Sequence, residues 1–114
     1  MDPIEHITNA LVKFRDERNW QQFHNPKDLA MALSIEAAEL NELFLLKKGE
    51  KEWNDVPLEE LKEELADVFA FAFLLANKFD LDVKDIVLDK IRKNGQKYPV
   101  DKSYNSAAKY NRLE

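Results

Sequence analysis

The sequence predicts an all-α fold, a single domain built as a four-helix bundle, and three observations support this. Apolar residues recur at helical spacing in four separate segments of the chain. Each of these segments is preceded by an Asp or Asn, residue types that cap helix N-termini. Only two of the 114 residues are glycine, and no stretch alternates polar and apolar residues as a half-buried strand does. A chain of this length has room for one domain.

The first two helices begin with the same signal, a capping residue followed by a proline in the first turn. Asp2 and Pro3 predict the start of the first helix. Its apolar stripe is formed by Ile4, Ile7, Leu11 and Phe14. Asn25 and Pro26 predict the start of the second helix, which we expect to end near Gly49. Its stripe is formed by Leu29, Leu33, Leu40, Leu43 and Phe44.

The third predicted helix, 58–79, is apolar on one face at first and nearly all round from Val68 onward. A helix of this kind is buried on more than one side, so we expect it to be the central helix. Asp82 caps the fourth, which we expect to stop near Gly95 and before Pro99. Its apolar stripe is formed by Val83, Ile86, Val87 and Ile91. Residues 100–114 show no strong period and are expected to form a C-terminal tail.

Composition narrows the possible partners and the compartment. The formal net charge is −5, which argues against polymeric nucleic acid as a partner, because binding to it needs a clustered excess of Lys and Arg. An acidic protein can still bind a phosphorylated small molecule through a divalent cation. Without cysteine there is no disulfide and no thiol nucleophile. No signal peptide or membrane-spanning run is visible, so we expect a cytoplasmic protein without a membrane partner.

Two acidic residues of the second helix occupy positions where apolar ones are expected. At 100° per residue, Glu36 falls near the middle of the apolar face, and Glu39, one turn later, lies at its edge. An ionised carboxylate in a core is unfavourable by several kcal/mol unless it is paired or bound to a metal. Glu36 therefore requires a partner.

The third helix carries a comparable pair, Glu64 and Asp67, which project to one side. Asp67 is in line with Phe71 and Leu74, so we expect it to face the protein. Four carboxylates gathered between two packed helices repel one another without a cation, and all-oxygen ligands favour Mg²⁺ or Mn²⁺. Glu63 is a candidate outer or alternative ligand. The alternative is that these are solvated surface acids, which by pattern alone is as good an interpretation for Glu39 and Glu64, but a weaker one for Glu36 and Asp67.

The fourth helix offers cations that complement this cluster. Lys90, Asn94 and Lys97 are spaced so that they continue its apolar stripe, and we expect them to face the bundle or its opening. Side chains placed there can bind the outer phosphates of a triphosphate. The alternative, at least as common, is that the lysines extend past the core into solvent.

The connection after the first helix concentrates aromatic and amide side chains. Trp20 and His24 flank two glutamines and a phenylalanine. Stacking combined with amide hydrogen bonding is how proteins bind an unpaired nucleobase. Trp53, in the next connection, is a lid for the same pocket or a packing anchor. The aromatic residues can instead serve helix packing.

Taken together, four segments resemble the successive motifs of MazG-like pyrophosphohydrolases, above all those of the dCTP pyrophosphatase branch. These segments are FRDERNWQQFH at 14–24, EAAEL at 36–40, EELADV at 63–68 and KNGQKYP at 93–99. They follow one another in order and cover nearly the whole chain. The ordered set is far more specific than any one motif.

The resemblance implies an all-α MazG-like domain over residues 1–99 with a tail at 100–114. It implies Mg²⁺-dependent hydrolysis of a deoxynucleoside triphosphate, dCTP or a modified dCTP, to the monophosphate and pyrophosphate, as nucleotide-pool house-cleaning. Its metal ligands match Glu36, Glu39, Glu64 and Asp67, with Glu36 or Glu39 as the catalytic base.

The resemblance also extends to the substrate. Its phosphate-binding residues match Lys93, Asn94, Lys97 and Tyr98, to which Lys90 is added from the helical spacing. Trp20 and His24 match its base-binding loop, and Trp53 is a further candidate there. The resemblance implies a homo-oligomer, a homodimer or a homotetramer. The alternative function is a non-catalytic nucleotide sensor or a protein-interaction module.

Overall fold

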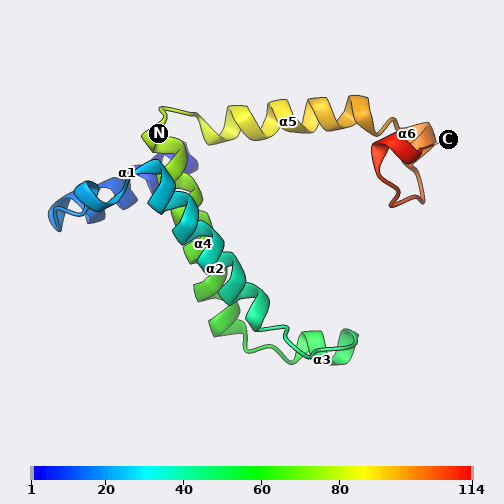
Figure 1. Ribbon diagram of the computed structural model, residues 1–114, viewed down its shortest axis with the longest axis horizontal. Helices are drawn as coiled ribbons and strands as arrows, with labels where there is room; N and C mark the ends of the chain where they lie inside the picture. Colours follow the sequence, from blue (N-terminus) through cyan, green and yellow to red (C-terminus); the bar gives the residue numbers. More distant parts are fainter. Residues whose placement is uncertain (1, 114) are drawn as a thin grey trace. The chain divides into compact units, whose positions relative to one another are not determined.

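The computed structural model describes residues 2–113 and is all-helical, as the sequence predicted, with no strand in that range (Figure 1). Its elements are α1 (Pro3–Glu17), a 3₁₀ turn (Gln21–Phe23), α2 (Pro26–Glu42), α3 (Glu50–Asn54), α4 (Leu58–Lys78), α5 (Val83–Lys97), α6 (Val100–Ser103) and a second 3₁₀ turn (Tyr110–Arg112). They fall into two compact units, Met1–Leu81 and Asp82–Glu114, each described on its own below.

The predicted helix starts at three of the four sites are confirmed by side-chain caps. In each, a carboxylate or amide oxygen accepts a hydrogen bond from the backbone N–H three residues later, which satisfies a donor that the first turn leaves free. These hydrogen bonds join Glu5 N to Asp2 Oδ1 at 2.8 Å, Asp28 N to Asn25 Oδ1 at 2.9 Å, and Asp85 N to Asp82 Oδ1 at 3.0 Å.

The prediction that the second helix continues to Gly49 was wrong. α2 ends at Glu42. The chain then turns through hydrogen bonds between residues three positions apart, such as Phe44 N–H to the Asn41 carbonyl at 3.0 Å. Leu46 adopts a φ of 66°, in the left-handed region that ends helices. Residues 43–46 continue the apolar pattern of α2, so periodicity did not reveal this end.

Two short helices were not predicted, which corrects the number of α-helices in residues 2–113 from four to six. α3 and α6 are each shorter than two turns, too short for an apolar period to show. Gly95 does not end α5, which continues to Lys97. A glycine inside a helix weakens it by roughly 1 kcal/mol but does not break it, and the helix stops before Pro99, which cannot continue it.

α4 is the central helix of the first unit, as predicted: α2 packs along it and α1 packs against it (Figure 1). Leu29 of α2 and Leu74 of α4 are buried, with 2% and 6% of their surfaces exposed. No residue of α5 is buried within its own unit. None of the helices in residues 2–113 combines the length and the apolar character needed to cross a bilayer.

A candidate metal centre and the pocket beside it

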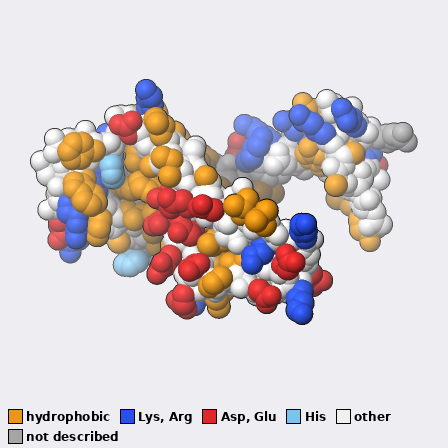
Figure 2. Space-filling view, turned by 60° about the horizontal axis from the view of Figure 1, so that its bottom comes forward, with side chains coloured by type: hydrophobic (Ala, Val, Ile, Leu, Met, Phe, Trp, Pro, Cys, Tyr) orange, Lys and Arg blue, Asp and Glu red, His pale blue; other side chains and the backbone are white. Residues whose placement is uncertain are grey.

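The packing of α2 against α4 brings together three of the four predicted metal ligands. One carboxylate oxygen each from Glu36 of α2 and from Glu64 and Asp67 of α4 lies within 4.8 Å of the other two. Glu39 lies beside this carboxylate cluster, close enough for its carboxyl group to raise the pKa of both Glu36 and Glu64. Figure 2 shows Asp and Glu side chains gathered on one face of the molecule.

Two oxygens of the cluster are shielded from solvent and unsatisfied. Oε2 of Glu36 and Oε2 of Glu64 are buried without a hydrogen-bond partner in the described part of the chain. Burial raises the pKa of Glu36 to about 7, with further contributions from Glu39, Asp67 and Glu64. Burial, Glu39, Asp67 and Glu63 raise the pKa of Glu64 too. The cluster therefore resists full ionisation unless a cation is present.

The donor set fits a hard divalent cation. Carboxylate oxygens from facing helices, two of them without a protein partner, are the ligands that Mg²⁺ and Mn²⁺ prefer. Buried oxygens with no donor cost free energy, and a cation removes that cost. Glu63, the candidate outer ligand, is exposed but close enough that its charge acts on Glu64.

The raised pKa of Glu36 predicts how the stability of the metal-free protein depends on pH. A carboxyl group whose pKa is higher in the folded state than its usual 4.5 binds more protons when folded, so its contribution to stability is lost as the pH rises from about 4.5 through about 7. Glu64 acts in the same direction. Thermal melting in a chelator should give a lower Tm at about pH 8 than at about pH 5.5.

Mg²⁺ should oppose this loss, because it binds the ionised carboxylates of the folded state alone. Its stabilising effect on Tm should therefore be larger at about pH 8 than at about pH 5.5. The carboxylate cluster does not titrate as described if the metal-free Tm rises steadily over this range.

A pocket of about 200 Å³ adjoins the carboxylate cluster in the first unit. Asp67 lines it together with two of the predicted base-binding residues, Trp20 and His24. Phe71 and Leu74 of α4 give it an apolar wall. The predicted base-binding loop and one predicted metal ligand thus share one cavity.

His24 presents an unsatisfied nitrogen in this region. Its Nδ1 is buried and has no hydrogen-bond partner among residues 2–113. Burial lowers the pKa of His24, as do the positive charges of Arg15 and Lys78, so the imidazole is neutral at pH 7. A neutral imidazole has one donor and one acceptor nitrogen, which suits contact with an uncharged ring.

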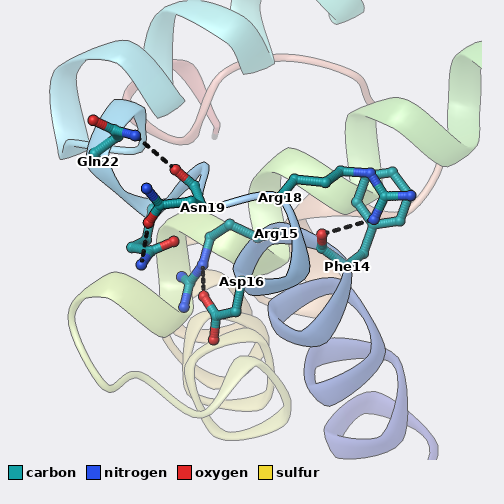
Figure 3. A network of polar contacts seen from close by, with 7 residues as sticks. Phe14, Arg15, Asp16, Arg18, Asn19 and Gln22 are labelled. Carbon is teal, nitrogen blue, oxygen red and sulfur yellow. Dashed lines mark hydrogen bonds and ion pairs between the residues drawn. The ribbon is translucent and has the colours of Figure 1, made fainter.

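The two glutamines of this loop build the loop itself. Gln21 Nε2 donates to Asn19 Oδ1 at 3.1 Å, and Gln22 Nε2 donates to the Asn19 carbonyl at 2.9 Å (Figure 3). Asn19 has a φ of 54°, a left-handed conformation that asparagine tolerates. Trp53 lies on α3 with about half of its side chain exposed (51%), and it is not among the described residues that line the pocket.

The predicted phosphate-binding residues belong to the second unit. Lys90 and Lys93 line a groove on α5, where Lys93 Nζ pairs with Asp89 Oδ2 at 3.1 Å. Lys97 Nζ lies 4.9 Å from the centre of the Tyr110 ring, which also contacts Tyr98 edge to face. Asn94, exposed on α5, accepts the Tyr98 N–H at its carbonyl.

Arg15 was not predicted to be a site residue, yet it lines the pocket together with Trp20 and His24. Its guanidinium pairs with Asp16 at 2.9 Å, and only 15% of its side chain is exposed. The signal available in the sequence was its position four residues after Leu11, which lines the same pocket.

Comparison with known proteins shows which family and which proteins this chain is similar to. The model of the MazG-like family matches residues 31–113. dCTP pyrophosphatase 1 of Rattus norvegicus is 39% identical, and that of Homo sapiens is 36% identical; each alignment covers 96% of this chain and 67% of the relative. A pyrophosphatase from Archaeoglobus fulgidus DSM 4304 has a similar fold, with a TM-score of 0.82 and 35% identity over 87% of this chain and 94% of the other.

Proposed function

Since this chain belongs to the MazG-like family and is a nucleoside triphosphate diphosphatase, we propose that it uses Mg²⁺ to hydrolyse dCTP or a modified dCTP. The products are the deoxynucleoside monophosphate and pyrophosphate, and the role is nucleotide-pool house-cleaning in the cytoplasm. The observation that carries the proposal is the carboxylate cluster of Glu36, Glu64 and Asp67, with two unsatisfied buried oxygens next to an apolar pocket.

In the proposed site the carboxylates of Glu36, Glu39, Glu64 and Asp67 hold Mg²⁺, for which Mn²⁺ can substitute. Held there, the cation would neutralise phosphate charge and lower the pKa of a water molecule. Glu36, Glu64 and Asp67 are close enough together to share one ion, and Glu39 lies beside them. A bound cation would favour the ionised forms of Glu36 and Glu64, whose pKa values are raised without it.

The proposed reaction is an in-line attack of water on the α-phosphorus. A bond forms between the water oxygen and this phosphorus, the bond to the bridging oxygen of the β-phosphate breaks, and pyrophosphate leaves. Glu36 or Glu39 accepts the proton that the water loses.

The base and the phosphates of the substrate are proposed to bind to different sets of residues. The base stacks on Trp20 and contacts His24, in the pocket that Asp67 also lines, and Trp53 is proposed to close over it. The phosphates are bound by a set of residues at the end of α5. These are Lys90, Lys93, Asn94, Lys97 and Tyr98. Arg92 and Lys93 share the single carboxylate of Asp89, so positive charge remains for a phosphate.

We also expect a homo-oligomer, a homodimer or a homotetramer, because apolar side chains remain exposed in both units. On α4, Phe69 is 52% exposed, and Ile91 of α5 is 60% exposed. Apolar side chains left exposed in each unit can be buried against another subunit. Light scattering coupled to size exclusion should give a mass of two or four chains, and Ile91→Asp should lower it, whereas the surface variant Lys62→Asp should not. A monomer at micromolar concentration would contradict this expectation.

The function is tested by incubating the protein with each dNTP and rNTP in the presence of Mg²⁺ and identifying the products. Monophosphate plus pyrophosphate, formed fastest from dCTP or 5-methyl-dCTP, is the expected result. Release of orthophosphate would contradict the proposed bond cleavage. Saturable binding without products would identify a nucleotide sensor, and the absence of both binding and products would favour a protein-interaction module.

A further inference from the structure

Arg15 is a shielded cation in the wall of the pocket that Trp20 and His24 line. It lies in the last turn of α1, and 15% of its side chain is exposed, compared with 49% for its partner Asp16. A charged group held away from water needs hydrogen-bond acceptors around it. The contacts of Arg15 therefore show which of its hydrogen-bond donors have an acceptor in the protein and which could bind a ligand.

The guanidinium of Arg15 uses one nitrogen within the protein. Nε donates to Asp16 Oδ1 at 2.9 Å, and the two terminal nitrogens have no partner among residues 2–113 (Figure 3). Arg18, one turn later, is different: its Nη1 donates to the Phe14 carbonyl at 3.0 Å, and its guanidinium stacks on the Phe14 ring at 3.6 Å. Arg18 is thus used to hold the end of α1, whereas the terminal donors of Arg15 remain free.

Backbone contacts place Arg15 at the end of the pocket where the predicted base-binding loop lies. The Arg15 carbonyl accepts the Trp20 N–H at 3.0 Å, which ties the tryptophan to this turn of the chain. Arg15 is also close enough to His24 for its charge to lower the pKa of the imidazole. The pocket, at about 200 Å³, is below the roughly 300–1,000 Å³ of sites for whole drug-sized ligands, so it suits one ring system.

We propose that Arg15 contacts the base and determines specificity, its two terminal nitrogens donating hydrogen bonds to O2 and N3 of cytosine. The inference rests on the proposed function and adds to it the residue that selects the base. Guanidinium is a planar donor fork without acceptors, which matches two adjacent acceptor atoms. In uracil and thymine, N3 carries a hydrogen and cannot accept.

The test compares kcat/KM for dCTP, 5-methyl-dCTP and dUTP in the wild-type protein, in Arg15→Gln and in Arg15→Lys. Hydrogen bonds to a charged group contribute about 1.5–3 kcal/mol, so Arg15→Gln should lower kcat/KM for dCTP roughly 10- to 100-fold, mainly through KM. 5-Methyl-dCTP presents the same hydrogen-bonding edge, so its kcat/KM should fall by as much. The kcat/KM for dUTP should change little, so the preference for cytosine should largely disappear.

Two controls separate this role from others. Arg15→Lys keeps the charge and the helix end but not the fork, and it should recover only part of the preference. Lys13→Gln removes one exposed charge from the same helix and should keep the wild-type preference. Circular dichroism melting of each variant reports whether the fold is retained.

Equal losses for dCTP and dUTP in Arg15→Gln would assign the residue to the phosphates and overturn the inference. An unchanged preference in both Arg15 variants would overturn it too. In either case, turnover by the wild type would leave the proposed function intact. No dNTP turnover by the wild type would overturn both the proposed function and the inference that rests on it.

Discussion

Glu36→Gln is expected to lower the Mg²⁺-dependent turnover of dCTP by at least roughly 1,000-fold. Loss of a group that merely supports a ligand lowers metal affinity or activity about 10- to 100-fold, and loss of a general base lowers the rate about 10²- to 10⁴-fold. Glu36 is proposed to act as a ligand and is one of two candidates for the base. Steady-state kinetics over a range of Mg²⁺ concentrations measures the effect.

The same substitution should leave the metal-free fold intact or stabilise it. Ionisation of Glu36 is opposed by burial and by three neighbouring carboxyl groups, and an amide removes that repulsion. At about pH 8 in a chelator, Glu36→Gln should melt at the wild-type temperature or above it. A matched control is Glu42→Gln, an exposed glutamate at the end of the same helix, which should keep activity. Full activity in Glu36→Gln would remove this residue from the site.

Asp67→Asn is expected to lower kcat/KM by at least about 100-fold, because Asp67 lies both in the carboxylate cluster and in the wall of the pocket. The loss of one negative ligand should weaken Mg²⁺ binding, so part of the loss should be recovered at high Mg²⁺ concentration. Calorimetric titration with Mg²⁺ and kinetics at several Mg²⁺ concentrations measure the two effects.

Glu60→Gln is the matched control for Asp67→Asn, since it removes a carboxylate from an exposed position of the same helix. It should bind Mg²⁺ and turn over dCTP as the wild type does. A similar loss in both variants would attribute the effect to the net charge of α4 instead of to coordination by Asp67.

Much of the fold could be predicted because its signals are local. Asp2, Asn25 and Asp82 cap helices through bonds to residues three positions away, and such contacts depend on neighbouring sequence alone. The end of α2 was not predictable in this way. Leu43 and Phe44 continue its apolar pattern, while the turn depends on a left-handed residue, Leu46, whose type does not favour that conformation.

Part of the candidate site could also be predicted from local sequence, and part depends on how the helices pack. Periodicity singled out Glu36 and Asp67 as lying on buried faces. Glu36 is half-buried, but Asp67 is exposed, and it is Glu64 that is half-buried on α4. That an oxygen of Glu36 lies within 4.8 Å of oxygens of Glu64 and Asp67 follows from the packing of α2 on α4, which no single helix specifies. Arg15 was missed for a related reason: its sequence neighbours are charged, and only the folded chain turns it toward Trp20 and His24.

Hydrolysis of dCTP in ¹⁸O-labelled water with Mg²⁺ tests the central claim most directly. If water attacks the α-phosphorus at the carboxylate cluster, mass spectrometry should find one heavy oxygen in dCMP and none in pyrophosphate. Glu36→Gln should form labelled dCMP at least roughly 1,000-fold more slowly than the wild type. Label in pyrophosphate, or label in dCMP formed equally fast by Glu36→Gln or without a divalent cation, would contradict the account.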